Sequence, residues 1–127
     1  MKIIVNKFIP VKRFTALTFY NIIFWQKAHE ALLEKEHYKE IVINHESIHM
    51  AQERDFALWL GKYPTLQIIV GGTIFYVVYI FYWLLNLIKG TTNAVKSIPF
   101  EKEAYAHDNN LNYLEFREDK AWKKYKV

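Results

Sequence analysis

The pattern of hydrophobic and polar positions divides the chain into an extended first third and a helical remainder. Residues 14–25 are rich in aromatic and β-branched side chains and favour a short turn at residues 20–21. This stretch predicts the two strands of a β-hairpin. Apolar residues within positions 3–9 predict an earlier strand that Pro10 interrupts or ends. The charged residues 28–39 fit a short exposed helix or a long loop.

Three main helices are predicted in the rest of the chain. Asn44 is a favourable N-cap for a helix over about residues 45–60. Residues 63–88 contain no charged side chain, and an apolar helix of that length is a candidate for crossing a bilayer. A serine shortly before Pro99 signals the start of the third helix. This order of elements predicts an α+β fold in a single domain that covers residues 1–127.

The composition narrows the range of functions. The chain contains no cysteine, so a metal ion would have to be bound by nitrogen and oxygen. Residues 1–7 lack the features of a signal peptide, and we expect a cytoplasmic location. The net charge of +4 is mild and the basic residues are scattered, which argues against nucleic acid as a partner. A lysine-rich stretch at residues 120–126 also contains aromatic side chains, a combination that suits an anionic membrane surface.

The stretch His45-Glu46-Ser47-Ile48-His49 has the spacing of a metal site. In a helix, His45 and His49 lie at positions i and i+4, so their ring nitrogens can reach one tetrahedral ion together. Glu46 points toward the same neighbourhood without being needed as a ligand. That is the position from which a carboxylate can deprotonate a zinc-activated water. The motif therefore predicts a zinc site with a general base beside it.

A catalytic zinc ion generally has three protein ligands, so a third donor is expected on another element. The downstream candidates are Glu101, Glu103, His107 and Asp108. On one helix, Glu101 and Tyr105 share a face, whereas Glu103 points roughly the opposite way. One of the two glutamates can therefore face the metal while the other faces solvent or Lys102.

Two stretches of the chain carry a resemblance to a known family. Residues 44–52 (NHESIHMAQ) and 99–105 (PFEKEAY) resemble the gluzincin branch of zincin metallopeptidases, and more closely a group of small bacterial zincin-like proteins with NHExxHxxQ and PFExEAY motifs. The resemblance implies a minimal zincin-like domain: an N-terminal hairpin or small sheet, the HExxH helix, a long apolar helix and a glutamate-bearing helix. It implies zinc as the cofactor, with His45, His49 and Glu101 as its ligands.

The resemblance also implies a reaction, the hydrolysis of a peptide or protein substrate with Glu46 as general base. Tyr105 stands where gluzincins carry an acidic residue, and its hydroxyl can hydrogen-bond a ligand histidine or the substrate oxyanion. His107 is the alternative for the oxyanion role. An edge strand of the hairpin can hold an extended peptide by main-chain pairing. Two other functions stay open: a zincin-fold binding protein with little or no catalysis, and a small membrane-anchored protein in which the HExxH sequence is accidental.

A membrane crossing at residues 63–88 conflicts with the metal site. A single crossing would place His49 and Glu101 on opposite sides of the bilayer, and two crossings need about 40 residues. The metal site therefore predicts that this segment does not span. It lies instead in the interface plane, packs into the core or pairs with another subunit, so we expect a membrane-surface contact or a homodimer through it. Tyr76 and Tyr79 recur at helical spacing along one side, which suits either a membrane interface or a polar-lined contact with the rest of the protein.

Overall fold

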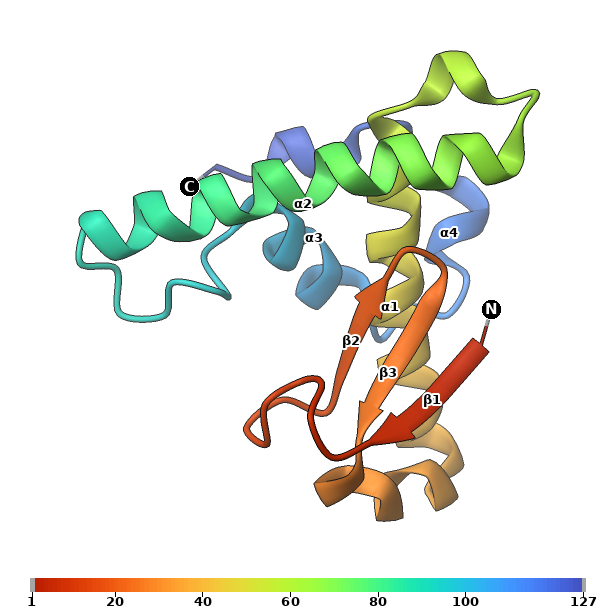
Figure 1. The fold of residues 1–127 in the computed structure, drawn as a ribbon, viewed down its shortest axis with the longest axis vertical. Coiled ribbons are helices and arrows are strands. Elements are labelled where there is room, and N and C mark those ends of the chain that lie inside the picture. The colour runs from red at the N-terminus through yellow and green to blue at the C-terminus, as the bar shows by residue number, and fades with distance from the viewer. Residues whose placement is uncertain (1, 127) are drawn as a thin grey trace.

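The computed structural model describes residues 2–126, in which a small β-sheet lies beside a group of helices (Figure 1). The strands are β1 (Lys2–Asn6), β2 (Ala16–Phe19) and β3 (Ile22–Gln26). The longer helices are α1 (Glu36–Asp55), α2 (Pro64–Ile88) and α3 (Pro99–His107). The shorter helical segments are η1 (Lys27–Glu34), η2 (Leu58–Leu60), α4 (Tyr113–Phe116) and η3 (Ala121–Lys124). The predicted α+β class is confirmed.

The predicted hairpin is present as β2 and β3. The two strands are antiparallel, with Ala16 opposite Trp25, and Tyr20 in the turn has a positive φ of 57°. β1 pairs with β3 in the parallel sense, so the strand order is β1-β3-β2. β2 is therefore an edge strand, and its outer edge faces away from β3.

The first strand is shorter than predicted. It ends at Asn6, whose side-chain oxygen accepts hydrogen bonds from the backbone N–H groups of Phe8 (2.9 Å) and Ile9 (2.6 Å). An asparagine that bonds its own following backbone turns the chain. The strand therefore stops before the apolar residues that suggested its continuation.

α1 begins well before the predicted motif helix and ends earlier. It starts at Glu36, so the prediction that Asn44 is its N-cap is wrong. The Asn44 side chain instead donates to the backbone carbonyls of His107 (3.3 Å) and Asp108 (2.9 Å) at the end of α3. A residue typical of helix caps thus satisfies the end of a neighbouring helix. Residues 28–39 form η1 and the first turn of α1.

α2 crosses α1 at two glycines. A Cβ atom at Gly71 would lie 2.1 Å from the carbonyl oxygen of Glu53, and one at Gly72 would lie 2.7 Å from the ring of Tyr20. Only residues without a side chain allow this approach. α2 is therefore held close against both α1 and the turn of the hairpin.

α2 is a single continuous helix along one side of the molecule, and its C-terminal end projects beyond the other helices (Figure 1). Its inner face contributes Phe75 to a core that includes Ile98, Phe100 and Trp122. In its most apolar 18-residue window, only 17% of the residues are buried. By length and composition, α2 is the one helix among residues 2–126 that could cross a membrane.

A buried ion network joins the C-terminal segment to α1 and α3. Arg117 donates from Nε to Oε1 of Glu103 (2.5 Å) and from Nη2 to Oδ2 of Asp55 (2.7 Å). Gln52 and Tyr113 also donate to the Glu103 carboxylate, at 2.8 and 2.9 Å. Glu103 does point away from Glu101, as helix geometry predicts, but it is buried rather than facing solvent. These contacts exclude it as the third metal ligand.

Candidate metal centre

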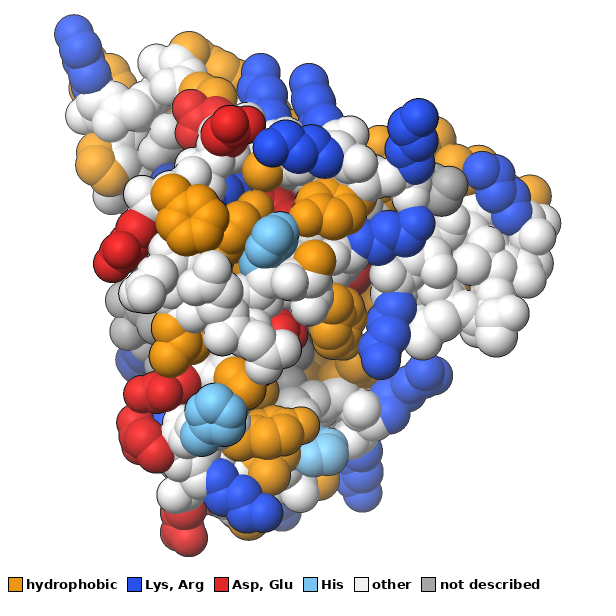
Figure 2. All heavy atoms as spheres, turned by 180° about the vertical axis from the view of Figure 1, so that it is seen from behind, with side chains coloured by type: hydrophobic (Ala, Val, Ile, Leu, Met, Phe, Trp, Pro, Cys, Tyr) orange, Lys and Arg blue, Asp and Glu red, His pale blue; other side chains and the backbone are white. Residues whose placement is uncertain are grey.

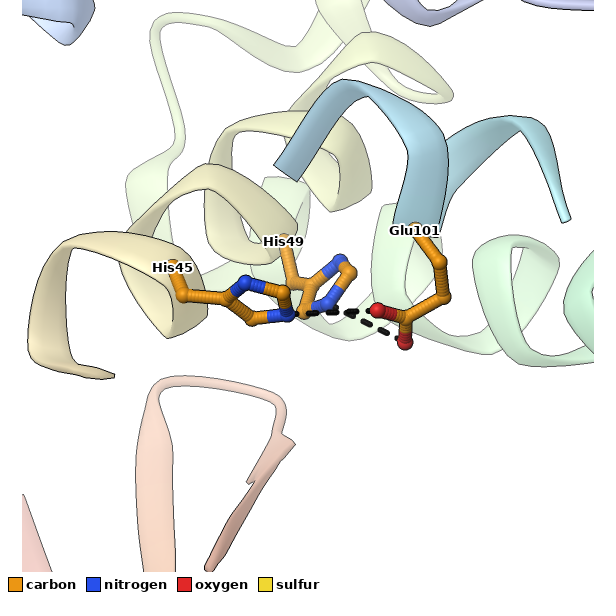
Figure 3. A group of neighbouring side chains, drawn as sticks. All are labelled: His45, His49 and Glu101. Carbon is orange, nitrogen blue, oxygen red and sulfur yellow. Dashed lines mark hydrogen bonds and ion pairs between the residues drawn. The ribbon is translucent and has the colours of Figure 1, made fainter. Parts of the chain in front are cut away.

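Three side chains from two helices point toward one another (Figure 3). His45 and His49 lie one turn apart on α1, and Glu101 lies in the first turn of α3. Nε2 of His45 is 3.2 Å from Oε2 of Glu101, and Nε2 of His49 is 3.3 Å from Oε1. Ligand atoms from all three residues lie within 4.8 Å of one another, so the group could hold a metal ion. The structure thus brings together the three residues predicted as ligands.

The two nitrogen–oxygen distances in this group fit a tetrahedral ion. Zinc binds histidine nitrogen at about 2.0–2.1 Å and carboxylate oxygen at about 2.0–2.2 Å. Two such ligands at the tetrahedral angle lie about 3.3–3.5 Å apart. The separations of the two histidines from Glu101, 3.2 and 3.3 Å, are close to that value. Two nitrogens and one oxygen also match the donor set of a catalytic zinc site, which keeps one position for water.

Each histidine is oriented by a hydrogen bond at its other ring nitrogen. Nδ1 of His45 lies 3.2 Å from Oδ2 of Asp108, and Nδ1 of His49 lies 2.8 Å from Oε1 of Gln52. The Gln52 amide nitrogen donates to the Phe100 carbonyl (2.9 Å), so its oxygen is left for the histidine. Each Nδ1 therefore carries the hydrogen, and each Nε2 is available as a ligand atom. Such contacts fix the tautomer and ring orientation of metal-binding histidines.

The two histidines and Glu101 are strongly coupled electrostatically. Burial lowers the pKa of His45, but its hydrogen bonds with Asp108 and Glu101 outweigh this effect and raise the pKa to about 10. Burial also lowers the pKa of His49, and the Glu101 charge more than reverses that effect. For Glu101, burial raises the pKa, but the neighbouring histidines lower it far below the ordinary range. In the metal-free protein, protons therefore occupy the positions that a cation would take.

Two hydroxyl groups from other elements contact the carboxylates of the site. The Tyr79 hydroxyl on α2 donates to Oε1 of Glu101 at 2.8 Å. The Thr18 hydroxyl on β2 donates to Oε2 of Glu46 and lies 3.1 Å from the Glu46 backbone oxygen. Glu46 is buried and lines the same cavity as the ligand residues. Because the Thr18 hydroxyl occupies Oε2 of Glu46, Oε1 of the same carboxylate is left to exchange a proton.

A third hydroxyl, that of Tyr76, joins β2 to α1. It accepts a hydrogen bond from the backbone N–H of Tyr20 (2.9 Å) and lies 2.8 Å from the Thr18 carbonyl and 3.0 Å from Oε1 of Glu53. The Tyr76 hydroxyl has one proton for these two acceptors, so it is shared between them unless Glu53 is itself protonated. A neutral Glu53 carboxyl would donate to Tyr76 and leave the tyrosine proton to the Thr18 carbonyl. Consistently, burial raises the Glu53 pKa from 4.5 to about 8. Tyr76 thus links the strand that positions Thr18 to the Glu53 carboxyl, whose raised pKa favours the protonated form at neutral pH.

A cavity of about 630 Å³ opens beside the ligands, a volume typical of small-molecule sites. Among the described residues, its charged lining consists of acidic groups and the two ligand histidines. The remaining walls are mainly aromatic and aliphatic side chains, including Phe14, Leu17, Tyr38, Ile41, Val42, Phe75, Tyr76, Tyr79, Val95 and Tyr105. The two tyrosines predicted to recur along one side of the apolar helix thus face the site rather than solvent.

Tyr105 lies at the border of this cavity and is 44% exposed. Its ring packs edge-on against the ring of His45, with 4.6 Å between the centroids. The carboxylate that contacts Nδ1 of His45 belongs to Asp108. Asp108 was a candidate third ligand, and this contact gives it a different role.

His107 takes no part in the site. Its Nε2 lies 2.7 Å from the Tyr125 hydroxyl, and its ring stacks on Tyr113 at 3.8 Å between centroids. The predictions of His107 as a ligand or as an oxyanion donor are therefore wrong. α3 turns enough between Glu101 and His107 to place their side chains on different faces.

The contributions of Thr18 and Glu53 were not predicted from the sequence. Thr18 lies in a strand far from the motif along the chain, and its role depends on how the hairpin packs on α1. Glu53 follows His49 by four residues, as His49 follows His45, so helical spacing could have placed it on the same face of the helix. The chain matches no family model, and comparisons with curated proteins and with solved structures find no match.

Proposed function

We propose that this chain is a zinc-dependent peptidase of the gluzincin type, with a minimal zincin-like fold. His45, His49 and Glu101 hold the ion, and Glu46 is the general base. The observation that carries the proposal is the pair of nitrogen–oxygen distances, 3.2 and 3.3 Å, which approach the edge of a zinc-centred tetrahedron. The hydrogen bonds to the Nδ1 atoms support it, because they orient both rings for metal binding.

When bound, zinc lowers the pKa of a coordinated water toward about 7 and polarises the scissile carbonyl. Glu46 accepts a proton from the attacking water on the oxygen that Thr18 leaves open. The same carboxyl then delivers that proton to the leaving amine. One water is consumed, the amide C–N bond breaks, and the products are a carboxylic acid and an amine.

Tyr105 is suited to donate a hydrogen bond to the substrate oxygen as negative charge develops there. Burial and the nearby charge of Glu101 raise its pKa to about 12, so its hydroxyl keeps a proton at neutral pH. Its ring contact with His45 holds the side chain at the border of the cavity. A neutral donor at that point stabilises an oxyanion without carrying charge into the free site.

The edge strand β2 offers a place for an extended peptide. The backbone N–H of Gln26 donates to the carbonyl of Thr15, so by antiparallel alternation Thr15 and Leu17 direct their backbone groups to β3. Ala16 and Thr18 then direct theirs to the outer edge beside the cavity, but the Thr18 carbonyl there already accepts from Tyr76. The backbone groups of Ala16 and the N–H of Thr18 are therefore the ones offered to a peptide. The aromatic and aliphatic cavity walls favour a substrate with a large apolar side chain next to the scissile bond.

The test is hydrolysis of a peptide library enriched in large apolar residues by the zinc-loaded wild type and by Glu46→Gln. We expect a loss of at least about 100-fold in kcat/KM, with zinc content unchanged. Glu40→Gln is the matched control, because Glu40 is exposed on the same helix. Equal rates for wild type and Glu46→Gln would refute the catalytic role. If both also retain zinc, the result favours a binding protein with a zincin-like site.

A further inference from the structure

The outer face of α2 is an apolar stripe that the rest of residues 2–126 leaves uncovered. The stripe consists of residues spaced three or four positions apart, and Thr73 is its one polar member. The apolar members are Leu66, Ile69, Val77, Ile80, Leu84 and Leu87. All are exposed, and Val77 has 65% of its surface accessible. The stripe runs for about 30 Å along a helix about 10 Å wide, which gives roughly 300 Å². Apolar patches of this size on soluble monomers often mark interaction sites.

The charges around this stripe distinguish its possible partners. Residues 56–100 contain Lys62, Lys89 and Lys96 but no aspartate or glutamate. Two copies packed through the stripe in antiparallel fashion would bring Lys62 near Lys89 of the second copy, and parallel packing would bring each lysine near its equivalent. Neither arrangement supplies a counter-charge from within residues 56–100. Anionic lipid headgroups would supply one at both ends of the helix.

The wider surface agrees with this choice of partner. Figure 2 shows lysine and arginine side chains predominating toward the side where the C-terminal end of α2 projects, whereas acidic side chains lie mainly along the opposite side. Aromatic residues also stand near the helix ends: Trp59 and Tyr63 are 71% and 63% exposed before it, and Trp83 is exposed near its end. Such rings are favoured at the level of lipid headgroups.

We propose that α2 docks in the plane of an anionic phospholipid surface, with its apolar stripe in the acyl boundary and its flanking lysines at the headgroups. An in-plane orientation follows from the other face of the helix. Gly71 packs against the backbone of α1, and Tyr79 bonds to Glu101. A spanning orientation that kept these contacts would place the Glu101 carboxylate in lipid, and one that broke them would dismantle the site. This docking is independent of zinc and of catalysis.

The first test measures binding to vesicles of phosphatidylcholine with about 30 mol % phosphatidylglycerol. Ile80→Asn/Leu84→Asn should weaken binding at least about tenfold, because both side chains are exposed and leave the fold intact. The matched control, Leu111→Asn/Phe116→Asn, alters exposed apolar residues outside α2 and should bind as wild type does.

Charge and self-association are tested with the same assay. Lys62→Gln should weaken binding to the anionic vesicles about fivefold and leave binding to pure phosphatidylcholine unchanged. Absence of vesicle binding by wild type would overturn the proposal. So would a stable dimer in solution that Ile80→Asn/Leu84→Asn makes monomeric, because the stripe would then belong to a second copy.

The orientation can be tested directly because the chain has no cysteine. Thr65→Cys and Thr92→Cys place a thiol at exposed positions near the two ends of α2. With protein added to sealed vesicles, an impermeant maleimide should label both positions from outside. Protection of one position until detergent is added would indicate a span and would overturn in-plane docking.

Discussion

The proton assigned to Glu53 leads to a prediction about pH and stability. Glu53 has 1% of its surface exposed, burial raises its pKa so that the neutral form is favoured, and a neutral carboxyl can donate to Tyr76. Glu53→Gln replaces the donating carboxyl by an amide of nearly the same shape that also donates but does not titrate. The variant should therefore keep the contact with Tyr76 and lose the dependence of stability on ionisation at this position.

The sign of the effect follows from the direction of the pKa shift. Burial raises the Glu53 pKa from 4.5 in the unfolded chain to about 8 in the folded, metal-free protein. Below pH 4.5 both states are protonated. Between pH 4.5 and 8 only the unfolded chain releases the proton, so the free energy of unfolding falls by up to about 1.4 kcal/mol per pH unit. The full loss is about 5 kcal/mol and is complete above pH 8.

The measurement is urea unfolding of metal-free wild type and Glu53→Gln at intervals from pH 5 to pH 9. The stability of the variant relative to wild type should rise across this range by several kcal/mol, while other titrating groups cancel in the difference. Glu40→Gln, an exposed change on the same helix, should show no such trend. A constant difference at all pH values would mean that Glu53 is ionised in the folded protein, and the assignment of the Tyr76 proton would be wrong.

Three other predictions concern the metal site and the helix crossing. The pKa values of both ligand histidines are raised in the metal-free protein, so zinc must displace protons when it binds. The logarithm of the zinc association constant, measured against a competing chelator, should therefore rise by one to two per pH unit around neutrality. Asp108→Asn should weaken zinc affinity about 10- to 100-fold, because it weakens the hydrogen bond that orients the His45 ring. Glu40→Gln should leave the affinity unchanged. An unaltered affinity in Asp108→Asn would show that Asp108 does not orient His45 for metal binding. Gly71→Ala should lower the free energy of unfolding, measured in urea, by more than about 2 kcal/mol, because its Cβ would lie 2.1 Å from the Glu53 carbonyl oxygen. Gly61→Ala should change this free energy little. Equal effects of the two changes would contradict the close crossing of α1 and α2.

The parts of the fold that depend on local chemistry could be predicted from the sequence. The hairpin followed from aromatic and β-branched residues around a turn, and α3 begins at Pro99, as the serine–proline signal indicates. The start of α1 was missed because Asn44 is a strong cap residue, and its capping partner belongs to another helix. The sequence around Asn44 does not show whether its side chain caps its own helix or the end of a neighbouring helix.

The candidate site likewise contains some residues that could be predicted from the sequence and others that could not. His45 and His49 could be predicted because helical spacing alone places them together, and the resemblance supplied Glu101. Asp108 could not be assigned its contact with His45, because that contact depends on how α3 lies across α1. Thr18 reaches Glu46 only after the hairpin docks on the same helix. Contacts between distant elements are set by tertiary packing, which the local pattern does not encode.

The central claim, that His45, His49 and Glu101 form a zinc site, is tested most directly by the metal content of purified protein. Purified without chelators, wild type and the control Glu40→Gln should contain about one zinc per chain, and Glu101→Ala should lose most of it. A wild-type content below about 0.1 zinc per chain after incubation with zinc and removal of the excess would contradict the claim. So would equal zinc content in wild type and Glu101→Ala.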